Sequence, residues 1–139
     1  MSVLHRDRKV ELLRSVPLFS GCSKKELQAI GRIADEIDFR PGRALIREGA
    51  PGSELFVLVD GTVEVTRKGR AIDAMGPGDF FGEMALLTSE PRNATVTTTS
   101  AVDALVITAR SFRQLVTDNP LIALKVMRAV AERVPDPVP

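Results

Sequence analysis

The stretch from Phe80 to Val96, FFGEMALLTSEPRNATV, combines residue types that suit the binding of a phosphate. GEMALL is rich in helix formers and lies between runs of strand formers, so it predicts a single short helical turn. The backbone N–H groups of Gly82 to Ala85 would then point outward unpaired, and Gly82 lets an anion approach closely. Arg92 adds a planar guanidinium that can donate to two phosphate oxygens. The pattern predicts an anion site.

Glu83 is the residue in this stretch that needs a separate explanation, because a carboxylate beside a phosphate repels it. We expect Glu83 to accept a hydrogen bond from a neutral group next to the phosphate, such as a sugar hydroxyl. We also expect it to balance the charge of Arg92 when no ligand is bound. Glu83 and Arg92 would together recognise a ribose hydroxyl and its phosphate.

Composition limits the class of protein. With 139 residues and 44% hydrophobic residues, the chain can bury one core, so we expect a single domain over residues 1–139. The net charge is +1 and the basic residues are spread along the chain, which predicts no direct nucleic-acid binding. The chain has no signal-peptide pattern and no apolar run near the roughly 20 residues that a membrane helix needs. We expect a cytoplasmic protein without a membrane span.

The sequence does not favour catalysis or metal binding. Cys22 and His5 are the single residues of their types, so they offer neither a disulfide nor a metal cluster, and nothing beside them supports a nucleophile pair. A metal-dependent barrel enzyme would need several histidines. A Glu83/Asp79 pair could serve glycoside hydrolysis, but it leaves Arg92 without a role. We therefore expect no enzyme activity and no metal.

Residues 6–34 are predicted to be helical. Val10, Leu13 and Val16 recur at three-residue spacing, and Ser23 with Glu26 has the form of a capping box before a second apolar series. The segment PLFSGC separates the two. Two short helices are expected.

Residues 35–108 change to short β-rich runs separated by turn signals, as in a small barrel or jelly roll. Val63 and Val65 alternate with polar residues and should share one face. Asp60-Gly61 separates two such runs and predicts a tight hairpin, since both central positions of a type I′ turn need positive φ.

Residues 109–134 return to a helical pattern, followed by a proline-rich tail at 135–139. Asn119 is expected to cap the last helix and Pro120 to occupy its first turn. The apolar residues of this helix spread over a wider arc than one-sided packing on the barrel requires. Either the helix packs deeply into its own domain, or the remaining surface meets bound ligand, a second copy in a homodimer, or another protein.

The segment resembles the phosphate-binding cassette of cyclic nucleotide-binding domains, in which F-G-E-x-A-L and P-R-x-A-T-V flank a short spacer. Here the cassette is residues 81–96, with Phe81-Gly82-Glu83-Met84-Ala85-Leu86 and Pro91-Arg92-Asn93-Ala94-Thr95-Val96. The upstream RPGRALIREGAPGSELFVLVDGTVEV is similar to the family's barrel segment, and the resemblance extends from Val16 to about Val134. It implies an α+β, mainly β fold, an eight-stranded jelly-roll β-barrel flanked by N-terminal and C-terminal helices.

The resemblance also implies the ligand and the role of each residue. Arg92 would bind the cyclic phosphate and Glu83 the ribose 2′-hydroxyl, while Asn93 stands where the family chooses between bases. A C-terminal helix would cover the base, with Met127 or Val130 as candidates. The expected ligand is cyclic AMP, with cyclic GMP as the alternative, bound by Gly82, Glu83, Met84, Ala85, Arg92, Asn93, Ala94 and Thr95.

Two related interpretations stay open beside a regulatory nucleotide sensor. Transcription regulators of the catabolite-activator type join this domain to a DNA-binding helix-turn-helix, and the chain could be the sensor fragment of such a protein. A domain of the same fold that binds no nucleotide and serves as an interaction module is the other. Gly82, Glu83 and Arg92 together favour nucleotide binding over the second.

Overall fold

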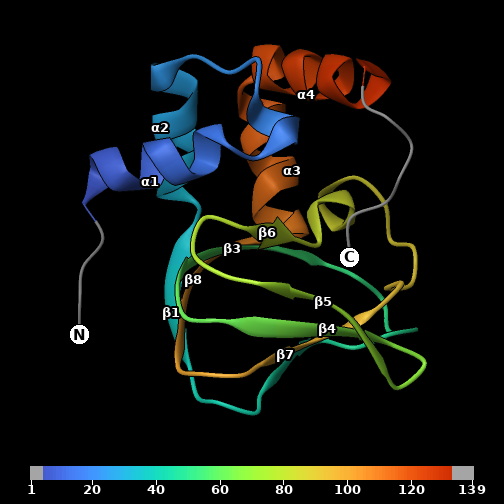
Figure 1. The fold of residues 1–139 in the computed structure, drawn as a ribbon. Coiled ribbons are helices and arrows are strands. Elements are labelled where there is room, and N and C mark those ends of the chain that lie inside the picture. Colours follow the sequence, from blue (N-terminus) through green and yellow to red (C-terminus); the bar gives the residue numbers. More distant parts are fainter. Residues whose placement is uncertain (1–4, 133–139) are drawn as a thin grey trace.

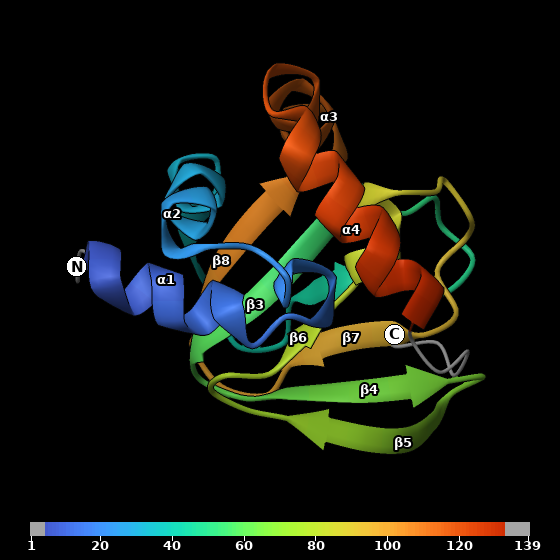
Figure 2. The same ribbon diagram turned by 90° about the horizontal axis from the view of Figure 1, so that it is seen from above.

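The computed structural model describes residues 5–132, in which the helices lie over one side of a two-sheet β-structure (Figures 1 and 2). The elements in chain order are α1 (Arg6–Arg14), η1 (Pro17–Phe19), α2 (Lys24–Arg32), β1 (Asp35–Phe39), β2 (Ala44–Ile46), β3 (Glu54–Asp60), β4 (Val63–Arg67), β5 (Arg70–Met75), β6 (Phe80–Phe81), η2 (Glu83–Leu86), β7 (Thr95–Thr98), β8 (Val102–Thr108), α3 (Ala109–Asp118) and α4 (Pro120–Glu132), where η1 and η2 are 3₁₀ turns.

The eight strands form two antiparallel sheets of four strands each. Their orders are β1-β8-β3-β6 and β2-β7-β4-β5, so consecutive strands pass repeatedly from one sheet to the other. This is the predicted α+β, mainly β architecture. The predicted change from helix to strand at residue 35 and back at residue 109 is also confirmed.

Strands β3 and β8 are buried on both faces and separate two apolar cores. Alternate residues point to opposite faces of a strand, so Phe56 and Leu58 enter the core between the sheets, whereas Leu55 and Val57 pack under the helices. Phe56 stacks on Phe81 of β6 with ring centroids 5.0 Å apart. The helical layer is therefore in direct contact with the strands of one sheet.

The N-terminal helices form as predicted. Val10, Leu13 and Val16 are buried, and Ser23 and Glu26 make both hydrogen bonds of the capping box. The Glu26 carboxylate also accepts from Lys125 Nζ at 2.5 Å, with both side chains partly buried. This ion pair joins α2 to α4.

The predicted hairpin at Asp60-Gly61 is wrong. Only Gly61 of the two has positive φ (90°), and the chain here leaves one sheet and enters the other, since β3 and β4 do not pair. The tight hairpin lies instead between β4 and β5, where Lys68 (φ 52°) and Gly69 (φ 77°) both take the left-handed conformation. Val63 and Val65 are buried on one face, as expected.

The last helix differs from its prediction in two respects. Asn119 occupies the position before α4, where its carbonyl accepts from the Ile122 N–H at 3.0 Å, but its side-chain amide donates to the Leu115 carbonyl at the end of α3. Pro120 does begin α4. The main contacts of α4 are with η1 and α3 rather than with the barrel. Predicted helical residues 133–134 and tail 135–139 lie outside the described residues.

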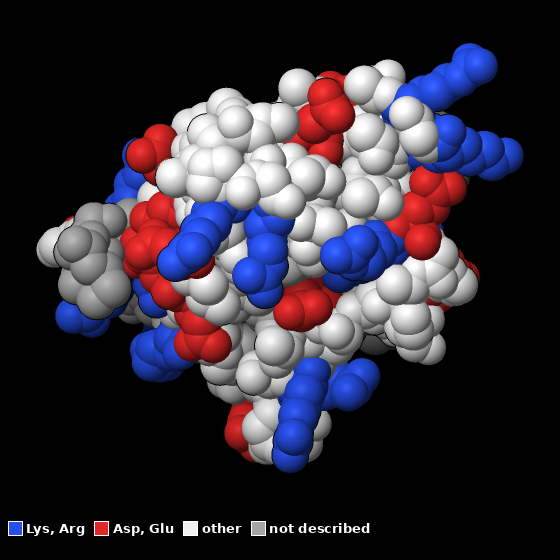
Figure 3. All heavy atoms as spheres, turned by 90° about the horizontal axis from the view of Figure 1, so that it is seen from below, with Lys and Arg blue, Asp and Glu red and all other residues white. Residues whose placement is uncertain are grey.

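Part of α4 faces outward and is apolar. Ile122 and Val126 are buried, whereas Leu121, Leu124 and Met127 are more than half exposed. On the opposite side of the molecule, basic and acidic residues are interspersed rather than gathered by sign (Figure 3). No helix among residues 5–132 is long and apolar enough to span a membrane.

Three carboxylates, those of Glu36, Asp38 and Asp60, lie around Asp103 on β8. Asp103 lies opposite Asp38 of β1 and Asp60 of β3 in the strand register. Burial raises its pKa to about 7, and a hydrogen bond with Glu36 and the charges of Glu36, Asp38 and Asp60 act in the same direction. Like charges that face each other across strands are destabilising. The Asp103 carboxyl should thus keep its proton in the folded protein at pH values where the same carboxyl is ionised in the unfolded chain.

We expect Asp103→Asn to raise the free energy of unfolding at pH 8 by about 0.5–1 kcal/mol. The folded pKa lies above the unfolded value of 3.8, so this group's favourable contribution is complete below about pH 4 and is lost as pH rises through 7. The gain from Asn should therefore shrink toward acid pH. Urea unfolding between pH 4 and pH 8 measures it.

Asp73→Asn, at an exposed position on β5 outside the acidic group, is the matched control. If the free energy of unfolding, relative to the wild type, depends on pH in the same way in both variants, the effect does not come from Asp103.

Candidate functional site

The predicted helical turn in the cassette exists as the 3₁₀ turn η2, directly after strand β6. Gly82 precedes it with a φ of 80°, a left-handed conformation that favours glycine. A Cβ added to Gly82 would lie 2.5 Å from Arg92 Nη1 and 2.6 Å from the Glu54 carbonyl oxygen. Both the backbone angle and the lack of space require glycine here.

The backbone of Arg92 is held by the loop between β2 and β3. Its N–H donates to the Ala50 carbonyl and its carbonyl accepts from the Gly49 N–H, each at 2.8 Å. Pro91 forms an isolated bridge with Pro51 in the same loop. A loop far from Arg92 in the sequence therefore sets the position of its backbone.

The Arg92 side chain is half-buried and is held by backbone carbonyls. Nη2 donates to the Glu54 carbonyl at 2.8 Å, and Nη1 lies at a longer 3.5 Å from the Gly82 carbonyl. A Cβ on Gly52 would come within 2.9 Å of Arg92 Nε, so this glycine too makes room for the guanidinium. Burial lowers the pKa of Arg92, and the negative charge of Glu54 opposes that effect.

A pocket of about 200 Å³ opens at this arginine. Its polar side chains are Arg92, Arg47 and Glu54, and the remaining lining residues are small or apolar. A positively charged, partly desolvated guanidinium in such a space favours an anion, since the low local dielectric strengthens the attraction. The lining residues are Ala44, Leu45, Ile46, Arg47, Ala50, Pro51, Glu54 and Arg92.

The residues of η2 occupy different environments. Glu83 is fully buried, with 0% exposure, and Ala85 is 8% exposed. The expected outward, unpaired N–H of Ala85 is wrong, because it donates to the Gly82 carbonyl at 3.1 Å. The i to i+3 bond of a 3₁₀ turn uses this donor. The Met84 carbonyl accepts from the N–H groups of residues 87 and 88.

The second half of the cassette leads into strand β7. The Asn93 carbonyl accepts from Arg67 Nε at 2.9 Å, and its side-chain amide makes no hydrogen bond within residues 5–132. Ala94 is fully buried in the core between the sheets. Thr95 Oγ1 accepts from the N–H of Glu48 at 2.9 Å. Asn93 is thus the member of this half with an unengaged polar side chain.

The sequence interpretation missed Glu54 and the contact of Gly52 with Arg92. The negative charge of Glu54 acts on the pKa of Arg92, whereas the expected charge balance between Glu83 and Arg92 stays a prediction. Gly52 and Glu54 flank Ser53 just before the apolar strand β3. That pattern predicts a turn into a strand but no contact with residue 92.

Within residues 5–132 no group of three or more His, Cys, Asp or Glu residues is arranged to hold a metal ion.

Comparisons with known proteins agree on one family. The family model described as cyclic nucleotide-binding domain matches residues 36–119. A CRP-like cAMP-activated global transcriptional regulator of Mycobacterium tuberculosis is 30% identical over 128 residues, which cover 88% of this chain and 57% of the regulator. The chain thus spans little more than half of that relative's length.

Two solved structures share the fold. The N-terminal domain of a transcriptional regulator from Streptomyces coelicolor A3(2) superposes with a TM-score of 0.82 at 28% identity, covering 88% of this chain and 91% of that one. The regulatory domain of Toxoplasma gondii PKA, crystallised with cAMP, gives a TM-score of 0.73 at 33% identity, covering 82% of this chain and 45% of that one.

Gly82→Ala should destabilise the fold more than Gly42→Ala, although both glycines have φ near 80°. A left-handed alanine costs about 1–2 kcal/mol at either position. A Cβ on Gly42 meets nothing within 4 Å, whereas one on Gly82 meets the Glu54 carbonyl and Arg92. Urea unfolding of both variants isolates the extra cost at Gly82. Equal destabilisation would show that Gly82 is needed only for its backbone angle.

Proposed function

The chain belongs to the cyclic nucleotide-binding domain family, whose model matches residues 36–119, and we propose that it binds cyclic AMP at the Arg92 pocket as a regulatory module. Cyclic GMP is the alternative ligand. Both the CRP-like regulator and the PKA regulatory domain are named for or crystallised with cAMP, which supports cyclic AMP as the first choice.

The observation that carries the proposal is the position of Arg92. Its guanidinium borders the pocket, is half-buried, and is held by the carbonyl oxygens of Glu54 and Gly82. A cyclic phosphate would supply the full negative charge that these neutral acceptors lack. Phosphate binding would therefore recover the desolvation cost of the buried cation.

Glu83 is the proposed partner of the ribose 2′-hydroxyl. It directly follows Gly82, whose carbonyl oxygen lies 3.5 Å from Arg92 Nη1, so Glu83 is adjacent in the chain to a group that the guanidinium reaches. A carboxylate oxygen accepts hydrogen bonds and a ribose hydroxyl donates one, so the two groups are complementary. Glu83 would distinguish a ribonucleotide from its 2′-deoxy form.

The remaining cassette residues would shape the site around the nucleotide. Gly82, Met84 and Ala85 form its turn, and Ala94 and Thr95 hold the start of β7 against the barrel. The unengaged amide of Asn93 is the candidate for choosing the base. Met127, 67% exposed, and half-buried Val130 are the candidates for covering it.

Ligand binding at the cassette would change the position of the C-terminal helices through direct contacts between elements. Turn η2 contacts α3, and α3 contacts α4. Ligand binding shifts such an arrangement only if the ligand favours one position of the helices over another. The Glu26–Lys125 ion pair holds α4 to α2 and would oppose a movement of α4.

Arg92→Ala should weaken cyclic AMP binding by about 2–5 kcal/mol, because the phosphate loses its buried charge partner. Isothermal titration calorimetry with cyclic AMP, cyclic GMP and AMP tests both the ligand and the site. Arg70→Ala, an exposed arginine on β5, is the control and should bind like the wild type. If no cyclic nucleotide binds the wild type, the chain is an interaction module; unchanged affinity in Arg92→Ala would refute the site.

Glu83→Ala should weaken cyclic AMP binding less than Arg92→Ala, by about 1–2 kcal/mol, through loss of a hydrogen bond to the hydroxyl. The affinity for 2′-deoxy cyclic AMP should stay the same, since that nucleotide has no hydroxyl to lose. Glu90→Ala, an exposed carboxylate in the same segment, is the matched control. Equal weakening of both nucleotides would contradict the hydroxyl role.

A further inference from the structure

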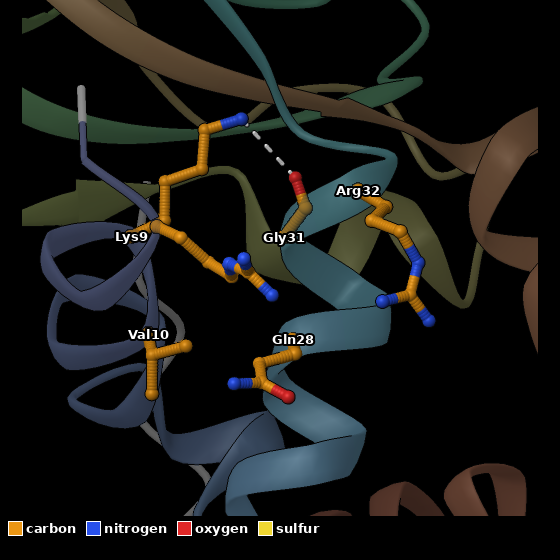
Figure 4. Close-up of a pocket in the computed structure, with 6 residues that line it drawn as sticks. Lys9, Val10, Gln28, Gly31 and Arg32 are labelled. Atoms are coloured by element: carbon orange, nitrogen blue, oxygen red, sulfur yellow. Dashed lines mark hydrogen bonds between the residues drawn. The ribbon is translucent and has the colours of Figure 1, made fainter.

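A second pocket lies between α1 and α2, in the helical layer and apart from the cassette. It has a volume of about 290 Å³ and shares no lining residue with the Arg92 pocket. Figure 4 shows Val10 of α1 and Gln28 of α2 facing each other across the gap, with Lys9 reaching over to α2. The lining residues are Arg6, Lys9, Val10, Gln28, Gly31 and Arg32.

The charged side chains of this pocket are all cationic. Arg6, Lys9 and Arg32 line it, and no aspartate or glutamate does. Lys9 Nζ donates to the carbonyls of Gly31 and Ala34 at 3.2 and 2.9 Å, which satisfies the C-terminal end of α2. Within the described part of the chain, Arg6 and Arg32 form no ion pair.

The carboxylates on these two helices do not line the pocket. The exposed Asp7 lies at the start of α1 beside His5, and Glu11 lies 3.7 Å from Arg14. Glu26, the acidic residue of α2, is bound to Lys125 of α4. The chain thus brings two arginines to a concave site without a counter-ion from either helix, which is an arrangement that attracts an anion.

The interior of the pocket is largely apolar, in contrast to its charged rim. Val10 is buried at 2% exposure, and long basic side chains contribute their aliphatic stems. Gly31 adds no side chain, and a Cβ there would still be 3.8 Å from Lys9 and Leu13 atoms. An inorganic ion would leave this apolar surface uncovered. The volume of the pocket is close to ~300 Å³, the lower end of the range for small-molecule sites.

We propose that the pocket between α1 and α2 binds a small organic anion, whose acidic group pairs with Arg6 and Arg32 and whose apolar body lies on Gly31 and the aliphatic stems of the basic side chains. Gln28 adds an amide that can donate to the same acidic group. This site is independent of the cyclic nucleotide site. Because Lys9 ties α1 to the junction of α2 and β1, a ligand here stabilises the helical layer.

The test uses 1-naphthalenesulfonate as a probe that combines a negative charge with an apolar ring. Titration followed by NMR should give saturable shifts of the Gly31 and Gln28 amides. Arg6→Gln and Arg32→Gln should each weaken binding about five-fold, which is what one partly exposed charge contact contributes. Arg113→Gln, an exposed arginine on α3, should leave the affinity unchanged.

Two further ligands separate the charge from the ring. Naphthalene-1-methanol, which has the ring without the charge, and inorganic phosphate, which has the charge without the ring, should each bind at least about ten-fold more weakly. Arg92→Ala should bind the sulfonate like the wild type. The proposal is overturned if Arg6→Gln and Arg32→Gln match Arg113→Gln, if the alcohol or phosphate binds equally well, or if Gly31 and Gln28 do not shift.

Discussion

The enclosure of the Arg92 guanidinium is the constraint on which the site depends. Carbonyl oxygens of Glu54 and Gly82 hold it, and Gly52 and Gly82 leave room that any side chain would fill. The Gly49 and Ala50 backbone fixes the same residue from the loop between β2 and β3. A cation held in this way by neutral groups is ordered before an anion arrives, so less freedom is lost on binding.

Strand β3 links this enclosure to the rest of the molecule. Its first residue, Glu54, contacts Arg92, and its last, Asp60, belongs to the carboxylate group around Asp103. Between them, alternate side chains enter the core between the sheets and the core beneath the helices. Because both faces are packed, a displacement of β3 would disturb the site and the helical layer together.

The helical layer carries two features that the barrel does not need. The Glu26–Lys125 ion pair joins elements from opposite ends of the described chain, and the cationic pocket between α1 and α2 lies beside one of them. Partly buried ion pairs restrict which packing arrangement is favoured more than they add to stability. The helical layer can thus be affected by a ligand in its own pocket and by movements of η2, which contacts α3.

The sequence by itself determined much of the local structure and the kinds of functional group that the cassette contains. Apolar spacing and the capping box were sufficient for α1 and α2, and the order of Gly82, Glu83 and Arg92 was sufficient to indicate an anion site and a family. These signals are local, since each depends on residues a few positions apart. The roles of the individual cassette residues remain predictions.

Only the tertiary structure decided which distant residues meet. It brought Glu54 close enough to act on Arg92, moved the tight hairpin from Asp60-Gly61 to Lys68-Gly69, and placed α4 on η1 and α3. A turn sequence shows that the chain reverses but not whether the next strand pairs in the same sheet. Strand pairing and helix docking depend on burial across the whole chain, and no short pattern contains that information.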